Sequence, residues 1–139
     1  MAKSGRYSAD RKKVATLTNA ATTNGTLAQC GTVFIATGAS GTTTYVLPAI
    51  AVAGKGWWCK VVKSAAAGAG GTIVVSAHAD DGGTAMVGIE SSLTSVALAG
   101  DDITLADGTD PGAFVECICD GSQWLVQTVS STAADVSIA

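Results

Sequence analysis

Charged residues are scarce in this chain of 139 residues. Lysine, arginine, aspartate and glutamate together make up 14% of the sequence, against about 25% in an average soluble domain. Glycine, alanine, serine and threonine are abundant, and the large apolar residues are mostly valine, isoleucine and leucine. This composition does not suit a solvated helical bundle, and it does not suit intrinsic disorder, which requires high charge and few β-branched residues. It favours closely packed strands in one domain.

Long apolar runs are also missing. No run approaches the roughly 20 residues that a membrane-spanning helix needs. The basic N-terminus is not followed by the apolar stretch of a secretion signal. We therefore expect synthesis in the cytoplasm and no membrane partner.

Cysteine and histidine are too few and too scattered to predict a metal centre. The cysteines are Cys30, Cys59, Cys117 and Cys119, and the single histidine is His78. A zinc site needs a second closely spaced pair beside the Cys117-x-Cys119 pair, and the chain has none. We expect four reduced, mostly buried thiols. A disulfide from Cys59 to Cys117 or Cys119 is the alternative.

No catalytic constellation can be assembled from the sequence. Ser76, His78 and Asp80 lie within five residues, which is too close along one strand to form a triad. The glycines of 64–71 lack the spacing of a phosphate-binding loop. The sequence therefore predicts a protein that is not an enzyme and has no cofactor.

Two acidic glycine turns, at 80–83 and 107–110, contain carboxylates that could bind calcium. Neither has the ligand spacing of a known calcium loop, and acidic glycine turns commonly join strands. We interpret both as connections between strands, with calcium binding as the alternative.

The net charge of −3 conceals a basic N-terminal arm. Such an arm can bind nucleic acid or dock on an acidic protein surface, or it can be a solubilising tail. Nucleic acid is the weaker interpretation, because the rest of the chain is acidic and repels phosphate. The residues concerned are Lys3, Arg6, Tyr7, Arg11, Lys12 and Lys13.

Short β-branched and aromatic runs separated by glycine-rich turns predict an all-β fold. We expect a compact β-sandwich or barrel of short antiparallel strands over residues 31–130. An extended arm and linker (1–30) precedes it, and a tail or edge strand (131–139) follows. Two hairpins are expected. One joins 32–37 to 43–47 across a Gly-Ala-Ser-Gly turn, and the other joins 113–119 to 123–129 across Asp120-Gly121.

The segment 45–63 organises the predicted domain. Pro48 ends one strand, because proline cannot donate to a ladder, and Gly56 leads into the next. Alternation places Trp57, Cys59 and Val61 on an inward face, which ends at Lys63. We interpret the tryptophan pair 57–58 as core or interface, with a sugar-stacking platform as the alternative.

Three stretches resemble the trimeric β-domains of tailed-phage virion proteins. They are TTYVLPAIAVAGKGWWCKVVK, TIVVSA and CICDGSQWLVQ, within residues 32–129. In those domains a V-x-L-P strand precedes a G-x-aromatic strand, and the domain ends near C-D-G-x-x-W-x-V. The resemblance implies that the matching residues define the fold and the interface of a homotrimer. These residues are Leu47, Pro48, Trp57, Trp58 and Trp124.

The resemblance also implies a function. Such domains occur in capsid decoration (cement) proteins and in head and tail fibres. The chain has no repeated shaft, which favours a decoration protein on the capsid exterior of the virion, with the major capsid protein as its partner. The basic arm would dock on the head. A tail-fibre or spike receptor-binding domain, contacting its receptor through loops 79–84 and 106–112, is the alternative.

Overall fold

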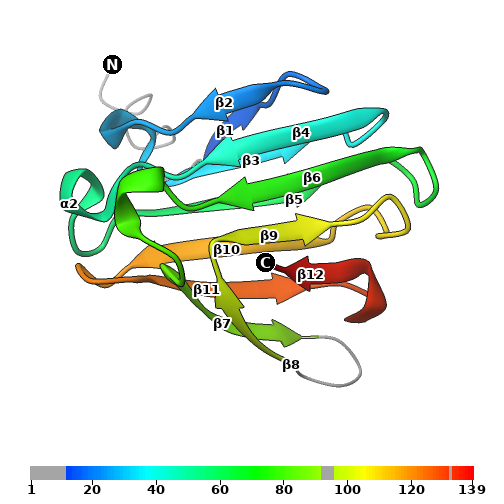
Figure 1. Ribbon diagram of the computed structural model, residues 1–139. Coiled ribbons are helices and arrows are strands. Elements are labelled where there is room, and N and C mark those ends of the chain that lie inside the picture. Colours follow the sequence, from blue (N-terminus) through cyan, green and yellow to red (C-terminus); the bar gives the residue numbers. More distant parts are fainter. Residues whose placement is uncertain (1–11, 92–95, 132) are drawn as a thin grey trace, which may run out of the picture.

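Two β-sheets pack face to face in the computed structural model, which describes residues 12–91, 96–131 and 133–139 (Figure 1). The larger sheet has seven strands in the order β1-β3-β5-β10-β11-β7-β8. The smaller sheet has five strands in the order β12-β9-β6-β4-β2. The predicted all-β sandwich is confirmed, and the sheets do not close into a barrel.

The elements are short and are joined by tight turns. The large sheet contains β1 (Lys13–Thr16), β3 (Thr32–Ala36), β5 (Trp58–Lys63), β7 (Met86–Ser91), β8 (Val96–Gly100), β10 (Phe114–Cys119) and β11 (Trp124–Val129). The small sheet contains β2 (Thr22–Asn24), β4 (Gly41–Val46), β6 (Gly71–Ser76), β9 (Asp102–Leu105) and β12 (Val136–Ile138). Single helical turns are η1 (Leu27–Gln29), α2 (Ile50–Ala53), η2 (Ala79–Asp81) and η3 (Ala133–Asp135).

Both sheets are mixed, so the expectation of antiparallel strands throughout is wrong. Strand β3 runs parallel to β1 and β5, β4 runs parallel to β2 and β6, and β7 runs parallel to β11. The reason is that consecutive strands from β1 to β6 alternate between the two sheets. Each return to the same sheet is then a crossover, which brings the next strand in with the same direction.

This alternation also corrects one of the two expected hairpins. Strands β3 and β4 do not pair, because they belong to opposite sheets. The turn between them has positive φ angles at Gly38 and Gly41, both 59°, and carries the chain across the sandwich. The second hairpin is confirmed, since β10 pairs with β11 in antiparallel register from Phe114↔Val129 to Cys119↔Trp124.

The sandwich begins earlier than the sequence suggested. Strand β1 pairs with β3, and β2 pairs with β4, so these two strands belong to the sheets and not to an arm. At the other end, β12 pairs with β9 as an edge strand of the small sheet. Four residues of the predicted docking arm lie outside the described residues: Lys3, Arg6, Tyr7 and Arg11.

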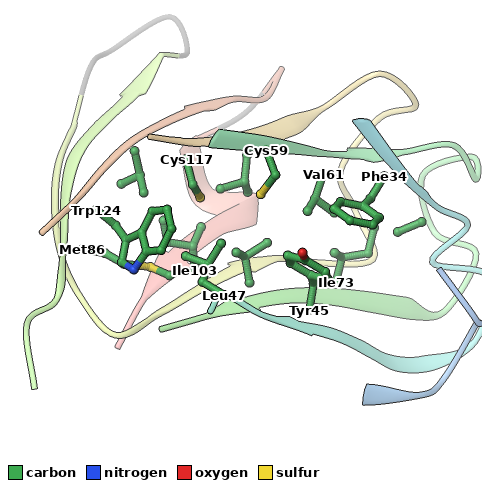
Figure 2. Packing of buried hydrophobic residues seen from close by; sticks show 14 of the residues in the cluster. Phe34, Tyr45, Leu47, Cys59, Val61, Ile73, Met86, Ile103, Cys117 and Trp124 are labelled. Atoms are coloured by element: carbon green, nitrogen blue, oxygen red, sulfur yellow. The ribbon is translucent and has the colours of Figure 1, made fainter. Parts of the chain in front are cut away.

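Alternating side chains from the two sheets fill the space between them (Figure 2). Phe34 and Tyr45 pack with ring centroids 4.4 Å apart. Cys59 and Cys117 are directly opposite each other on β5 and β10. All four cysteines are free thiols, so the alternative of a disulfide is not realised. The inward face of β5 is confirmed, and it extends one residue further than expected, because Lys63 is also fully buried.

Candidate interaction surface

The residues expected to define the fold lie mainly in the core. Leu47, Pro48 and Trp124 are buried, and Trp57 is 2% exposed. The Trp57 and Trp124 rings meet edge to face at 83° with centroids 5.5 Å apart. Trp58 lies on the opposite, outer face of β5 and is only partly buried. The two neighbouring tryptophans therefore cannot form one sugar-stacking platform.

The described end of the basic arm is attached to the sandwich. Lys12 and Lys13 are exposed. The Lys13 Nζ atom donates hydrogen bonds to the carbonyls of Ala28 (2.7 Å) and Cys30 (3.4 Å). This contact holds the start of edge strand β1 next to η1.

His78 and the buried cysteines take part in the local structure of the sandwich. His78 Nδ1 accepts a hydrogen bond from the backbone N–H of Asp80 at 3.2 Å, which caps η2. Contact with the Cys117 thiol and burial raise the pKa of Cys59 well above its usual value. Burial also raises the pKa of Cys119. Thiols with raised pKa values stay protonated at neutral pH and are poor nucleophiles.

Several acidic side chains in the turns accept backbone hydrogen bonds. Asp81 Oδ1 accepts from the Ile50 N–H at 2.9 Å, and Asp101 Oδ1 accepts from Thr84 and Ala85. The Asp120 carboxylate accepts from the N–H groups of Ser122 and Gln123 at 2.8 and 2.9 Å. Within 12–91, 96–131 and 133–139, no three His, Cys, Asp or Glu side chains are grouped as metal ligands.

Asp120 makes the stability of the fold sensitive to acid. Its hydrogen bonds from Ser122 and Gln123 lower the pKa of the carboxyl group to about 2, from about 3.9 in an unfolded chain. A lowered pKa adds stability above the unfolded value, and this stability is lost as the pH falls toward the folded value. We expect Asp120→Asn to flatten the decline in unfolding free energy between about pH 4 and pH 2. Urea titrations across this range test it.

The control for this experiment is Asp110→Asn, which removes an exposed acid from another turn. The difference between the Asp120→Asn and Asp110→Asn profiles isolates the hydrogen bonds of the Asp120 turn from the loss of one negative charge. An Asp120→Asn profile parallel to the wild type would show that the turn contributes nothing to acid sensitivity.

The most unusual surface is the outer side of the large sheet, which is largely apolar. Here we call it the outer apolar face. In the register of the sheet, one row holds Ile35, Val62, Phe114 and Val129, and another holds Trp58, Ile118, Leu125 and Val87. The row between them runs Val14, Val33, Lys60, Glu116, Gln127 and Ile89.

Two charged side chains sit in the centre of this face and neutralise each other. Lys60 Nζ lies 2.9 Å from Glu116 Oε2 and 4.0 Å from the centroid of the Phe114 ring. Beside them is a shallow hollow of about 290 Å³ with a mainly apolar lining. Its lining side chains include Val87, Ile89, Ile118 and Leu125.

The outer side of the small sheet has the opposite character. Most of its outward residues carry hydroxyl or other polar groups, as expected for a sheet face in contact with water. They are Thr22, Asn24, Thr42, Thr44, Val46, Thr72, Val74, Ser76, Asp102, Thr104 and Ser137.

Sequence reasoning found most of the strands but missed β2 and the outer apolar face. The signal was present, because β5, β10 and β11 carry apolar residues at both odd and even positions. Strands that are apolar on both sides are typical of sheets covered on both sides.

Comparisons with known proteins give no assignment. No protein-family model matches the chain, and no curated protein matches it. Among the described residues, no helix has the length and apolar character needed to cross a bilayer.

Proposed function

We propose that this chain is a bacteriophage capsid decoration protein, a non-enzymatic homotrimer that binds the outer surface of the head and stabilises the capsid. The observation that carries the proposal is the resemblance of residues 32–129 to the trimeric β-domains of tailed-phage virion proteins. In support, Leu47, Trp57 and Trp124 from the shared motifs meet in one core cluster. The broad outer apolar face is also suited to a protein that works in an assembly.

The proposed mechanism is stabilisation by linkage. A decoration protein that bridges neighbouring major-capsid subunits binds the assembled shell and not its separated subunits. Such binding stabilises the assembled shell by about 2.7 kcal/mol per site when the concentration of free decoration protein is 100 times its dissociation constant. The shell then resists the outward pressure of packaged DNA.

The basic arm is the proposed docking element. It consists of residues 1–13, and its cations are suited to an acidic surface on the head or on a neighbouring trimer. The structure fixes where the arm can be removed, since Lys13 is already part of β1. A chain that starts at Lys12 keeps that strand.

Deletion of residues 1–11 tests this role. We expect the shortened chain to keep the melting temperature and the oligomeric mass of the full chain, because β1 and its pairing with β3 are retained. We expect its binding to undecorated heads in a co-sedimentation assay to fall by at least about tenfold, since three cations are lost. The major capsid protein of the same phage supplies the heads.

A matched variant separates charge from length in this experiment. Lys3→Gln, Arg6→Gln and Arg11→Gln together keep the full arm but remove the three cations that the deletion removes. This triple variant should bind heads as weakly as the deletion and with less dependence on salt. Unchanged binding of both proteins would remove the arm from the mechanism.

A tail-fibre or spike receptor-binding domain remains the second proposal. In that role, loops 79–84 and 106–112 would contact the receptor. These loops lie at opposite ends of β5 (Figure 1). Asp81 accepts a hydrogen bond from Ile50 in α2, which precedes β5. The Asp107 carbonyl accepts one from Lys63, the last residue of β5. They do not line one tip, which favours the decoration role. Adsorption of the purified protein to host cells would support the receptor-binding role instead.

A further inference from the structure

We propose that the outer apolar face of the large sheet is the surface through which copies of this chain associate. The inference concerns a contact between two chains and goes beyond the homotrimer of the proposed function, on which it does not depend. It assigns the residues of β1, β3 and β5 on one chain to face those of β10, β11 and β7 on the next.

The contrast between the two outer faces is the first reason. Both sheets belong to the same sandwich and share its core, so both would meet water equally in a lone chain. The small sheet carries threonine and serine on its outer side, whereas the large sheet carries valine, isoleucine, leucine and aromatic residues. Ile89, Ile118 and Leu125 are 49%, 42% and 43% exposed. A continuous apolar face of this kind marks an interaction site.

The size of the face is the second reason. Strands lie about 4.8 Å apart and rise about 3.3 Å per residue, so six strands of four to six residues present a flat area of roughly 500 Å². Two such faces in contact bury about 1,000 Å² before the relief of the side chains is counted, which meets the threshold of about 1,000 Å² for a specific interface. The face is therefore large enough for a stable contact with another chain.

The pattern of charge on the face identifies the partner as another copy. Among the described strand residues of the face, only Lys60 and Glu116 are charged, and they lie on the neighbouring central strands β5 and β10. The face is thus neutral in a chain whose net charge is −3. Two copies can approach through it without the repulsion that other parts of their surfaces would cause.

The order of the strands makes the face complementary to itself. Consider a rotation axis that runs parallel to the strands between β5 and β10. It sets the β1-β3-β5 half of one chain against the β10-β11-β7 half of the next, at the same height along the strands. Lys60 then meets Glu116 of the other chain, and the exposed Val14 meets the exposed Ile89.

The same rotation matches the apolar rows. The row through Val62 and Phe114 lies against its own copy, and in the row on the other side of the charged pair Trp58 lies against Ile118. Apolar side chains therefore cover apolar side chains on both sides of the central charged pair. This rotation is a half turn, so it pairs two chains through their whole faces in a self-complementary contact.

A lysine placed in the face tests the assignment. Leu125→Lys puts an unpaired charge into the apolar hollow of the face, and Leu125 is exposed enough for the single chain to fold unchanged. The matched control is Val74→Lys, which places the same charge on the outer side of the small sheet. Sedimentation equilibrium then measures the mass of each protein in solution. Protein concentrations run from about 1 to 100 µM, because the weaker specific interfaces have dissociation constants in the micromolar range.

We expect the wild type and Val74→Lys to associate equally, and Leu125→Lys to raise the dissociation constant at least about 30-fold. Ile89→Lys, on β7, should act like Leu125→Lys. Circular dichroism and melting curves confirm that each variant is folded. The inference is overturned if the wild type is monomeric throughout this range, or if Leu125→Lys and Ile89→Lys associate as the wild type does.

Binding to heads is measured separately and keeps the two proposals distinct. If the wild type associates through this face but does not bind heads, the result supports the inference and counts against the decoration role. If the wild type is monomeric and the Leu125→Lys variant no longer binds heads, the face is the contact with the capsid protein and the inference is overturned.

Discussion

Replacement of Trp124 by alanine should lower the free energy of unfolding by about 3–5 kcal/mol. Trp124 begins β11, is fully buried and has the largest of the fully buried side chains. It lies beside Met86 at one end of the core (Figure 2), and its ring and that of Trp57 meet edge to face. Alanine would leave a large cavity between the two sheets, and the short strands around it have little freedom to close it.

Trp58 provides a matched control for this experiment. It is the same residue type on the outer side of β5, and Trp58→Ala should cost only about 1 kcal/mol in the isolated chain. Both substitutions are best made in the Leu125→Lys background, so that association does not enter the measurement. Urea unfolding is followed by circular dichroism, because each variant loses a fluorophore. Equal losses at Trp124 and Trp58 would show that the core does not depend on the buried ring.

The strands were predictable because their signals are local. Alternation placed Trp57, Cys59 and Val61 inward, and Asp120-Gly121 marked the β10–β11 hairpin, since a tight turn fixes both the pairing and the register of its strands. Sheet membership was not predictable in this way. The turn between β3 and β4 has the composition of a hairpin, yet the chain crosses the sandwich there. Only contacts between distant segments decide that choice.

Two glycines show why the crossover escaped sequence reasoning. Gly71 begins β6 so close to Gly38 that a β-carbon on it would lie 2.2 Å from the Gly38 carbonyl oxygen. This approach joins the turn after β3 to a stretch that looks in sequence like a flexible connector. Nothing in the composition of 64–71 specifies such a partner. The same holds for the outer apolar face, whose rows exist only once β5, β10, β11 and β7 are known to be neighbours.

Lys63 is the clearest case in which a local rule failed. A lysine at the end of an apolar alternation is expected to turn toward water. Instead its Nζ atom donates hydrogen bonds to the carbonyls of Ala106 (3.0 Å) and Asp107 (2.8 Å), and to the Thr109 hydroxyl at 3.4 Å. The Thr109 hydroxyl in turn donates to the Ala106 carbonyl. The buried ammonium group therefore holds the loop between β9 and β10 against the end of β5.

We expect Lys63→Met to lower the free energy of unfolding by about 2 kcal/mol or more. The methionine fills the same volume, but the Ala106 and Asp107 carbonyls each lose a charged donor and keep only their bonds from Thr109 and Gly68. A hydrogen bond to a charged group contributes about 1.5–3 kcal/mol. Removal of a buried charge offsets part of this loss. Lys60→Met is the control, because Lys60 lies on the same strand but faces outward in a partly exposed ion pair with Glu116. Such a pair contributes about 1 kcal/mol or less.

The pH dependence of this loss distinguishes the buried ammonium group from a simple packing defect. Burial lowers the pKa of Lys63, whereas an unfolded lysine has a pKa of about 10.4. Between these two values the unfolded chain binds more protons than the folded one, so the contribution of Lys63 to stability rises with pH. The deficit of Lys63→Met relative to the wild type should therefore widen from neutral pH toward about pH 10. The buried thiols are present in both proteins, so their effect cancels in the difference. A deficit that stays constant with pH, or one no larger than that of Lys60→Met, would contradict this role for Lys63.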